Sequence, residues 1–176
     1  MAIHRLNHAV LYVRDVARTV DFYRSVLGFR VKAELPGGRG AFMQAPDSTN
    51  DHDIAFFGIG EGAGDSQAGR ATVGMYHLAW EVQTLDELEE LATKLANAGA
   101  LVGASDHGTT KSLYAHDPDG LEFEVVWLIP AHLLDDAAIA QGAARILPLD
   151  LAKEKARYGG DTRGGLGISV PLGISV

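Results

Sequence analysis

Two stretches of the chain open with the same pattern: NHAVLYVRDVARTVDFYRSVLG at residues 7–28 and YHLAWEVQTLDELEELATKLANAG at residues 76–99. Each has a histidine in second position, then β-forming apolar residues, then apolar residues at helical spacing. Asp15 is the expected N-cap of the first helix, and Thr84 with Glu87 forms a capping box for the second. The sequence therefore predicts a strand followed by an amphipathic helix, twice.

Each predicted helix is followed by three shorter strand-like runs. In the first copy these runs are RVKAEL, AFMQA and DIAFFGI; in the second they are LVGAS, KSLYAH and LEFEVVWLI, with DPDG as the last turn. The order β-α-β-β-β thus occurs over residues 3–60 and again over 73–129, and a repeat of about 70 residues is too long for a solenoid unit. We expect an α+β fold in which residues 1–129 form one domain from two duplicated modules around a shared cleft.

The remaining residues, 130–176, are expected to form an extension of the domain. Residues 130–158 read as helical, and the Gly-rich end repeats LGISV on either side of Pro171. Gly-rich ends of this kind are usually flexible. A partner subunit is one way in which such a tail is held in place.

Composition excludes several functional classes. The 176 residues carry a formal charge of −8, which disfavours nucleic-acid binding. No apolar run is long enough for a membrane span, and the N-terminus lacks a secretory signal, so we expect a cytoplasmic protein. Because the chain has no cysteine, any metal site must use histidines and carboxylates.

Two histidines, His8 and His77, occupy equivalent positions in the repeat, and strand alternation turns both away from the helix-facing side. In the last predicted strand the apolar residues alternate with Glu122 and Glu124, which share the other face. Two imidazoles and one carboxylate form a set that leaves open positions on Fe(II). Each histidine alone is also compatible with a structural role, and Glu124 with an edge salt bridge; the paired placement favours a metal site.

This pattern resembles the vicinal oxygen chelate superfamily, which includes glyoxalases, fosfomycin- and bleomycin-resistance proteins and extradiol ring-cleaving dioxygenases. The resemblance covers residues 3 to about 129, and the superfamily's DPDG-x-x-x-E ending is present as residues 117–120 with Glu124. It implies paired βαβββ modules and a metal in the cleft between them. The motif is common throughout the superfamily, so it indicates the fold more strongly than the function.

More specific features of the sequence resemble the one-domain members of the extradiol branch. That branch takes one metal histidine from the first strand of each module and a glutamate from the last strand, which implies His8, His77 and Glu124 as ligands. It also has a tyrosine ten residues before the metal glutamate, here Tyr114, and a histidine in a His-x-x-Ala-hydrophobic motif, here His52. Without the resemblance, Tyr114 reads as a core aromatic and His52 as a solvated turn residue.

One further histidine departs from the pattern of that branch. The branch usually has a histidine nine residues before the tyrosine, whereas His107 precedes Tyr114 by seven. His107 lies between Asp106 and Gly108, which is also typical of a turn. Its role therefore stays open between the active site and the turn.

The resemblance implies a metal-dependent dioxygenase that opens a catechol-like diol with O₂ to a muconic-semialdehyde-type product. Fe(II) is the expected metal, with Mn(II) or another divalent ion as alternatives. His52 would exchange protons with the diol, Tyr114 would hydrogen-bond a substrate oxygen, and His107 would assist. Small aromatic diols and O₂ are the expected partners, and a homo-oligomer, a dimer or larger, is expected because extradiol enzymes often have four modules.

Three rival functions remain on the same scaffold. A metal-dependent lyase, isomerase or glyoxalase-like enzyme would need no O₂, but Ala55 stands where glyoxalases carry a fourth ligand. A fosfomycin-resistance-like enzyme would need a basic pocket, for which Lys111 and Arg39 are the candidates. A metal-free protein that sequesters a ligand is the third class, and three candidate ligands count against it.

Overall fold

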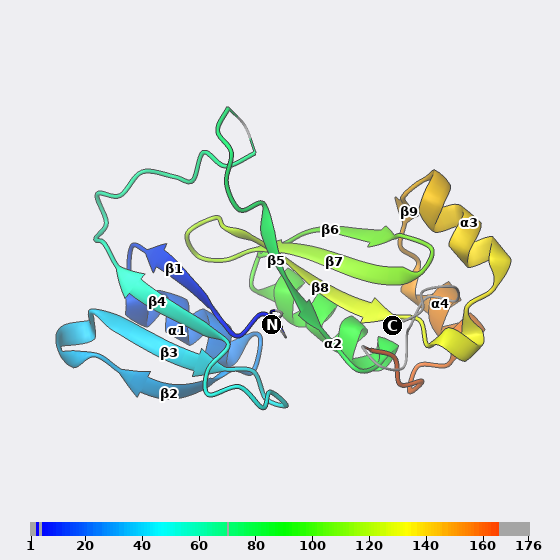
Figure 1. The fold of residues 1–176 in the computed structure, drawn as a ribbon, viewed down its shortest axis with the longest axis horizontal. Helices are drawn as coiled ribbons and strands as arrows, with labels where there is room; N and C mark the ends of the chain where they lie inside the picture. The colour runs from blue at the N-terminus through cyan, green and yellow to red at the C-terminus, as the bar shows by residue number, and fades with distance from the viewer. Residues whose placement is uncertain (1–2, 4, 70, 166–176) are drawn as a thin grey trace. The chain divides into compact units, whose positions relative to one another are not determined.

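A computed structural model describes residues 3, 5–69 and 71–165 of the chain (Figure 1). They form two compact units: the described part of residues 1–67 with Asp117–Leu121, and the described part of residues 68–176 without that loop. His4 and the last part of the expected flexible Gly-rich end, residues 166–176, lie outside the described residues. Each unit combines a β-sheet with helices, which confirms the α+β fold class.

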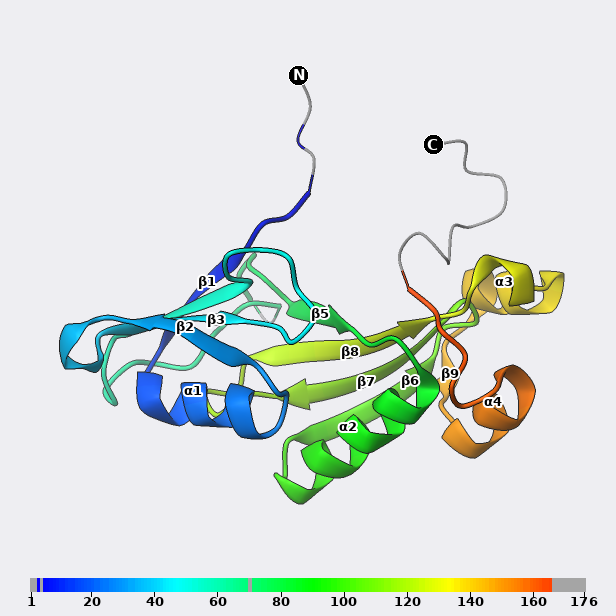
Figure 2. The same cartoon turned by 90° about the horizontal axis from the view of Figure 1, so that it is seen from below.

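The first unit is a four-stranded sheet with one helix. Its elements are β1 (Ala9–Val13), α1 (Val16–Ser25), β2 (Arg30–Glu34), the 3₁₀ turn η1 (Pro36–Gly38), β3 (Gly40–Gln44) and β4 (Ile54–Gly58). The strand order is β1-β4-β3-β2, with β1 parallel to β4 and the other pairs antiparallel. Helix α1 covers one face of this sheet (Figure 2).

Helix α1 forms where the sequence predicts it. The Asp15 carboxylate accepts a hydrogen bond from the Arg18 backbone N–H at 3.0 Å, and Gly28 beyond the helix has a φ of +78°. Val20 and Tyr23 are buried on one side of the helix, while Tyr12 of β1 is exposed. Tyr12 therefore lies on the face of the sheet that α1 does not cover.

The second unit repeats this topology and adds to it. Its elements are β5 (His77–Glu81), α2 (Leu85–Asn97), β6 (Leu101–Asp106), β7 (Thr110–His116), β8 (Glu122–Leu128), the 3₁₀ turn η2 (Ala131–Leu133), α3 (Asp136–Ala144), β9 (Leu147–Pro148) and α4 (Leu151–Tyr158). The strand order is β5-β8-β7-β6-β9, with β5 parallel to β8. Both hydrogen bonds of the predicted Thr84–Glu87 capping box are present at α2.

The extension after β8 is less uniformly helical than the sequence predicts. Helices α3 and α4 start at the capping carboxylates of Asp135 and Asp150, but between them the short strand β9 pairs antiparallel with β6. Figure 1 shows α3 and α4 at the end of the second sheet. Within the residues described, no helix has the length and apolar character that a membrane span needs.

Candidate metal and substrate site

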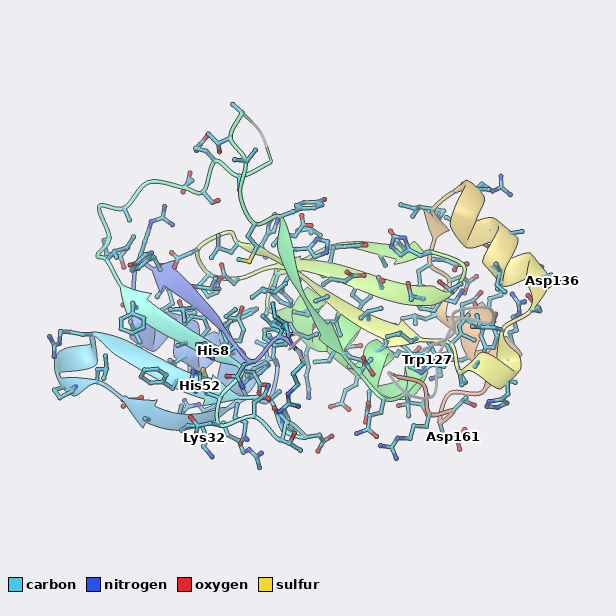
Figure 3. All side chains as sticks on the ribbon, viewed as in Figure 1. His8, Lys32, His52, Trp127, Asp136 and Asp161 are labelled. Atoms are coloured by element: carbon cyan, nitrogen blue, oxygen red, sulfur yellow. The ribbon has the colours of Figure 1, made fainter. Side chains whose placement is uncertain are left out.

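The first unit brings two of the predicted site residues together. His8 directly precedes β1, and the centre of its ring lies 4.4 Å from the centre of the His52 ring, which precedes β4 (Figure 3). The two residues are neighbours because β1 and β4 pair in parallel, with Ala9 opposite Ile54. The residues at the N-terminal ends of β1 and β4 therefore lie side by side.

The ring of His52 has two different surroundings. Nδ1 lies 2.9 Å from a carboxylate oxygen of the exposed Asp51, and this contact keeps the pKa of Asp51 below its ordinary value. Nε2 is buried and has no hydrogen-bond partner among the described residues. Phe42 packs edge-on against the ring, with centres 5.1 Å apart. An imidazole held through Nδ1 presents Nε2 as the free basic nitrogen.

The second unit brings His77 and Glu124 together. Nε2 of His77 lies 3.2 Å from Oε2 of Glu124, and both side chains are half-buried. Two ligands bound at about 2.1 Å to one divalent ion, at a right angle, are about 3.0 Å apart. The spacing and the chemistry of this pair therefore fit two neighbouring ligands of a divalent metal such as Fe(II) or Mn(II).

Tyr114 and His107 form a second pair in this unit. Nε2 of His107 lies 2.8 Å from the hydroxyl oxygen of Tyr114, and the rings of Tyr114 and His77 have centres 5.9 Å apart. Burial, together with the negative charge of Glu124, raises the pKa of Tyr114 to about 12. The phenol therefore stays protonated near neutral pH and can donate a hydrogen bond. The spacing of seven residues thus still allows His107 to reach Tyr114.

The predicted triad takes its ligands from both units, with His8 in the first and His77 and Glu124 in the second. Among the described residues, no group of three or more histidines and carboxylates forms a ready metal site. Binding of one metal ion by His8 together with His77 and Glu124 therefore stays a prediction.

Two residues bear on the rival functions. Ala55 pairs with Val10 as Glu124 pairs with Ala79, so Ala55 occupies the equivalent position in the first unit, and it is fully buried. Lys111 is 1% exposed and forms ion pairs with Asp106 and Glu154. Ala55 provides no fourth ligand, and the Lys111 ammonium is already neutralised by two carboxylates.

The sequence predicts no role for three neighbours of the site. Asp51 and Phe42 contact His52, and Glu122 faces His77 with Oε1 3.5 Å from Nδ1. The alternation of β8 does place Glu122 on the same face as Glu124. By contrast, the contact of Phe42 depends on the register of β3 with β4, in which Phe42 pairs with Ala55.

The sequence matches the model of a known protein family. The family model of the glyoxalase/bleomycin resistance protein/dioxygenase superfamily matches residues 5–125. The chain belongs to this superfamily. The match includes the strands that carry His77, Tyr114 and Glu124, so the superfamily assignment covers both repeats.

Curated relatives within the superfamily have different activities. Biphenyl-2,3-diol 1,2-dioxygenase 3 of Rhodococcus globerulus is 34% identical over 117 residues, which cover 66% of this chain and 59% of that enzyme. A lactoylglutathione lyase of Neisseria meningitidis is 28% identical over 138 residues, which cover 69% of this chain and 89% of the lyase. The chain therefore matches less than two thirds of the dioxygenase's length.

Solved structures of superfamily members share the fold. A glyoxylase/bleomycin resistance protein/dioxygenase domain from Frankia sp. matches with a TM-score of 0.60 and 22% identity, covering 71% of this chain and 92% of that one. A fosfomycin resistance protein from Listeria monocytogenes, solved with Mn(II), matches with a TM-score of 0.53 and 23% identity over 70% and 90% of the two chains. At these identities the matches establish the fold alone.

Proposed function

We propose that this protein is an extradiol-type dioxygenase that cleaves the ring of a small aromatic diol with O₂. The observation that carries the proposal is the His77–Glu124 pair at 3.2 Å, with Tyr114 beside His77 and with His107 on the Tyr114 hydroxyl. The identity of 34% to a biphenyl-diol dioxygenase adds support from sequence.

His8, His77 and Glu124 are the proposed metal ligands. An Fe(II) ion in this set of ligands would offer open coordination positions at which a diol and O₂ meet, and Mn(II) is the second choice. Both atoms of O₂ enter the product, and the ring carbon–carbon bond beside the diol breaks. The protein's part is to bind and orient the diol and to move its protons.

His52 is the proposed acid–base residue. Asp51 holds Nδ1, so the buried Nε2 is free to take the proton of a diol hydroxyl and to return it to the product. Tyr114, kept protonated by its raised pKa, donates a hydrogen bond to a substrate oxygen. His107 fixes the direction of the Tyr114 hydroxyl.

The test is anaerobic reconstitution of the protein with Fe(II), followed by catechol and air-saturated buffer. Ring cleavage predicts consumption of one O₂ per catechol and a new yellow absorbance from the semialdehyde product. The matched control is Glu124→Ala, which should give neither signal. One bound metal per chain with no O₂ uptake from catechol, 3-methylcatechol and 2,3-dihydroxybiphenyl would contradict the proposal.

A non-oxidative metal enzyme is the second candidate function. It is favoured by the match that covers 89% of a lactoylglutathione lyase. The buried Ala55 in place of a fourth ligand counts against a glyoxalase in particular. Turnover of the hemithioacetal of glutathione and methylglyoxal without O₂ consumption would favour this candidate.

A further inference from the structure

We propose that Glu122 is a positioning residue that holds His77 in the tautomer with the proton on Nδ1, so that Nε2 is free for the metal. The inference rests on the proposed metal site at His77 and Glu124 and adds a residue to its support. Histidines that bind metals commonly donate their other N–H to a carboxylate, which fixes the ring and raises its affinity for the metal.

The two atoms concerned have no hydrogen-bond partner in the described part of the chain. Nδ1 of His77 and Oε1 of Glu122 lie 3.5 Å apart, and both are buried without a hydrogen-bond partner among the described residues. Buried polar atoms rarely stay unpaired, because each has given up water without compensation. Each of these atoms is therefore the partner available to the other.

The register of β5 and β8 explains why the imidazole meets two carboxylates. His77 pairs directly with Glu122, and the next residue on the same face of β8 is Glu124, paired with Ala79. The ring lies between the two, with Nδ1 toward Glu122 and Nε2 toward Glu124 at 3.2 Å. In this arrangement Nε2 faces the proposed metal position, and Nδ1 faces the carboxylate that holds the ring.

In the first unit, the carboxylate equivalent to Glu122 is Asp53, and it stabilises a loop rather than a histidine. Asp53 stands two residues before Ala55, as Glu122 stands two residues before Glu124. Both oxygens of Asp53 are used by the loop before β4, which it joins through the Ala45 N–H and the Ser48 hydroxyl at 2.8 and 2.7 Å. Glu122 instead lies between two histidines, with Oε1 3.5 Å from Nδ1 of His77 and Oε2 3.8 Å from Nε2 of His116.

The test compares Glu122→Leu and the isosteric Glu122→Gln with wild type, using Glu34→Gln on the exposed strand β2 as a matched control. Calorimetric titration with Mn(II) measures metal affinity, and ¹⁵N NMR of the metal-free protein reports the tautomer of His77. We expect Glu122→Leu to weaken Mn(II) binding about 10–100-fold and to shift the proton away from Nδ1. Glu122→Gln keeps an acceptor oxygen and should retain the tautomer and part of the affinity.

Two results would overturn the inference. One is an unchanged affinity and tautomer in a folded Glu122→Leu protein, and the other is complete loss of binding in Glu122→Gln, which would make Glu122 a direct ligand. The proposed function fails separately, if wild type binds no Mn(II). The NMR tautomer then decides by itself whether Glu122 holds His77.

Discussion

At the scale of single residues, the two histidines of the first unit have different surroundings and therefore different expected roles. Nδ1 of His8 lies 2.8 Å from the side-chain oxygen of the neighbouring Asn7, and the residue is exposed. His52 is half-buried, with Asp51 on one nitrogen and the other nitrogen unpartnered among the described residues. The exposed imidazole suits a ligand, and the held one suits proton transfer.

Replacing His52 should reduce turnover, whereas replacing His8 should weaken metal binding. His52→Ala should bind Mn(II) or Fe(II) as wild type does but lose about 10²–10⁴-fold in kcat, the usual contribution of a general acid–base residue. His8→Ala should lose metal affinity. Metal titration alongside steady-state O₂ uptake checks both, and a fully active His52→Ala would refute the acid–base role.

At the scale of elements, helix α3 packs against the turn that carries His107. A Cβ built on Gly142 of α3 would lie 2.6 Å from the carbonyl oxygen of His107, and one built on Gly108 would lie 2.2 Å from that of Ala138. Backbones can approach this closely only without side chains. The helix therefore fixes the turn from which His107 reaches Tyr114.

Gly142→Ala tests this contact. Alanine should gain about 1 kcal/mol of helix propensity, but displacing backbone should cost about 1–3 kcal/mol, so we expect a net loss of stability. The His107–Tyr114 contact should loosen as well. Chemical denaturation measures the loss, with Gly62→Ala as control, because nothing lies within 4 Å of a Cβ there. A Gly142→Ala protein more stable than wild type would contradict the close packing.

A buried ion-pair group links the extension to the second sheet. Lys111 of β7 contacts Asp106 of β6 and, at 3.0 Å, Glu154 of α4. Burial raises the pKa of Asp106, but hydrogen bonds from Gln141, Lys111 and the Gly108 N–H outweigh it, so the net pKa lies below the ordinary value of 3.8. The ionised carboxylate is thus favoured in the folded state.

This lowered pKa predicts a specific acid sensitivity. The contribution of Asp106 to stability should be present in full above the unfolded pKa of about 4 and be lost as the pH falls through the lower folded pKa. Asp106→Asn should be less stable at pH 7 and lose less stability between about pH 4 and pH 2 than wild type. Urea unfolding across this range measures both, with the exposed Asp161→Asn as control. Parallel curves for Asp106→Asn and wild type would disprove the assignment.

At the scale of the whole molecule, local patterns predicted most elements correctly. Strand alternation and the caps Asp15 and Thr84 depend on near neighbours in sequence, and the structure confirms them. The strand β9 was missed because two residues acquire strand geometry only by pairing with β6. The burial of Lys111 was missed for a similar reason, since Glu154 lies in a distant helix.

The candidate site, like the elements, could be predicted from the sequence only in part. The repeat predicts that His8 and His77 occupy equivalent positions, and the structure places them just before β1 and at the start of β5, whereas His52, Tyr114 and His107 followed only from the resemblance to the extradiol branch. Their support was not predictable, because the pairing of His52 with Asp51 and of His77 with Glu122 depends on side-chain direction. A homo-oligomer stays a prediction, which light scattering would check.

We propose that one metal ion is held by His8, His77 and Glu124 together. The most direct measurement is anaerobic Fe(II) or Mn(II) titration of wild type, His8→Ala and His77→Ala under identical conditions. We expect one ion per chain in wild type and, in each variant, a loss of affinity larger than the about 10–100-fold that follows removal of a residue supporting a ligand, because each variant loses one of three direct ligands. Wild-type affinity in His8→Ala would contradict it, since the metal would then be held by the second unit alone.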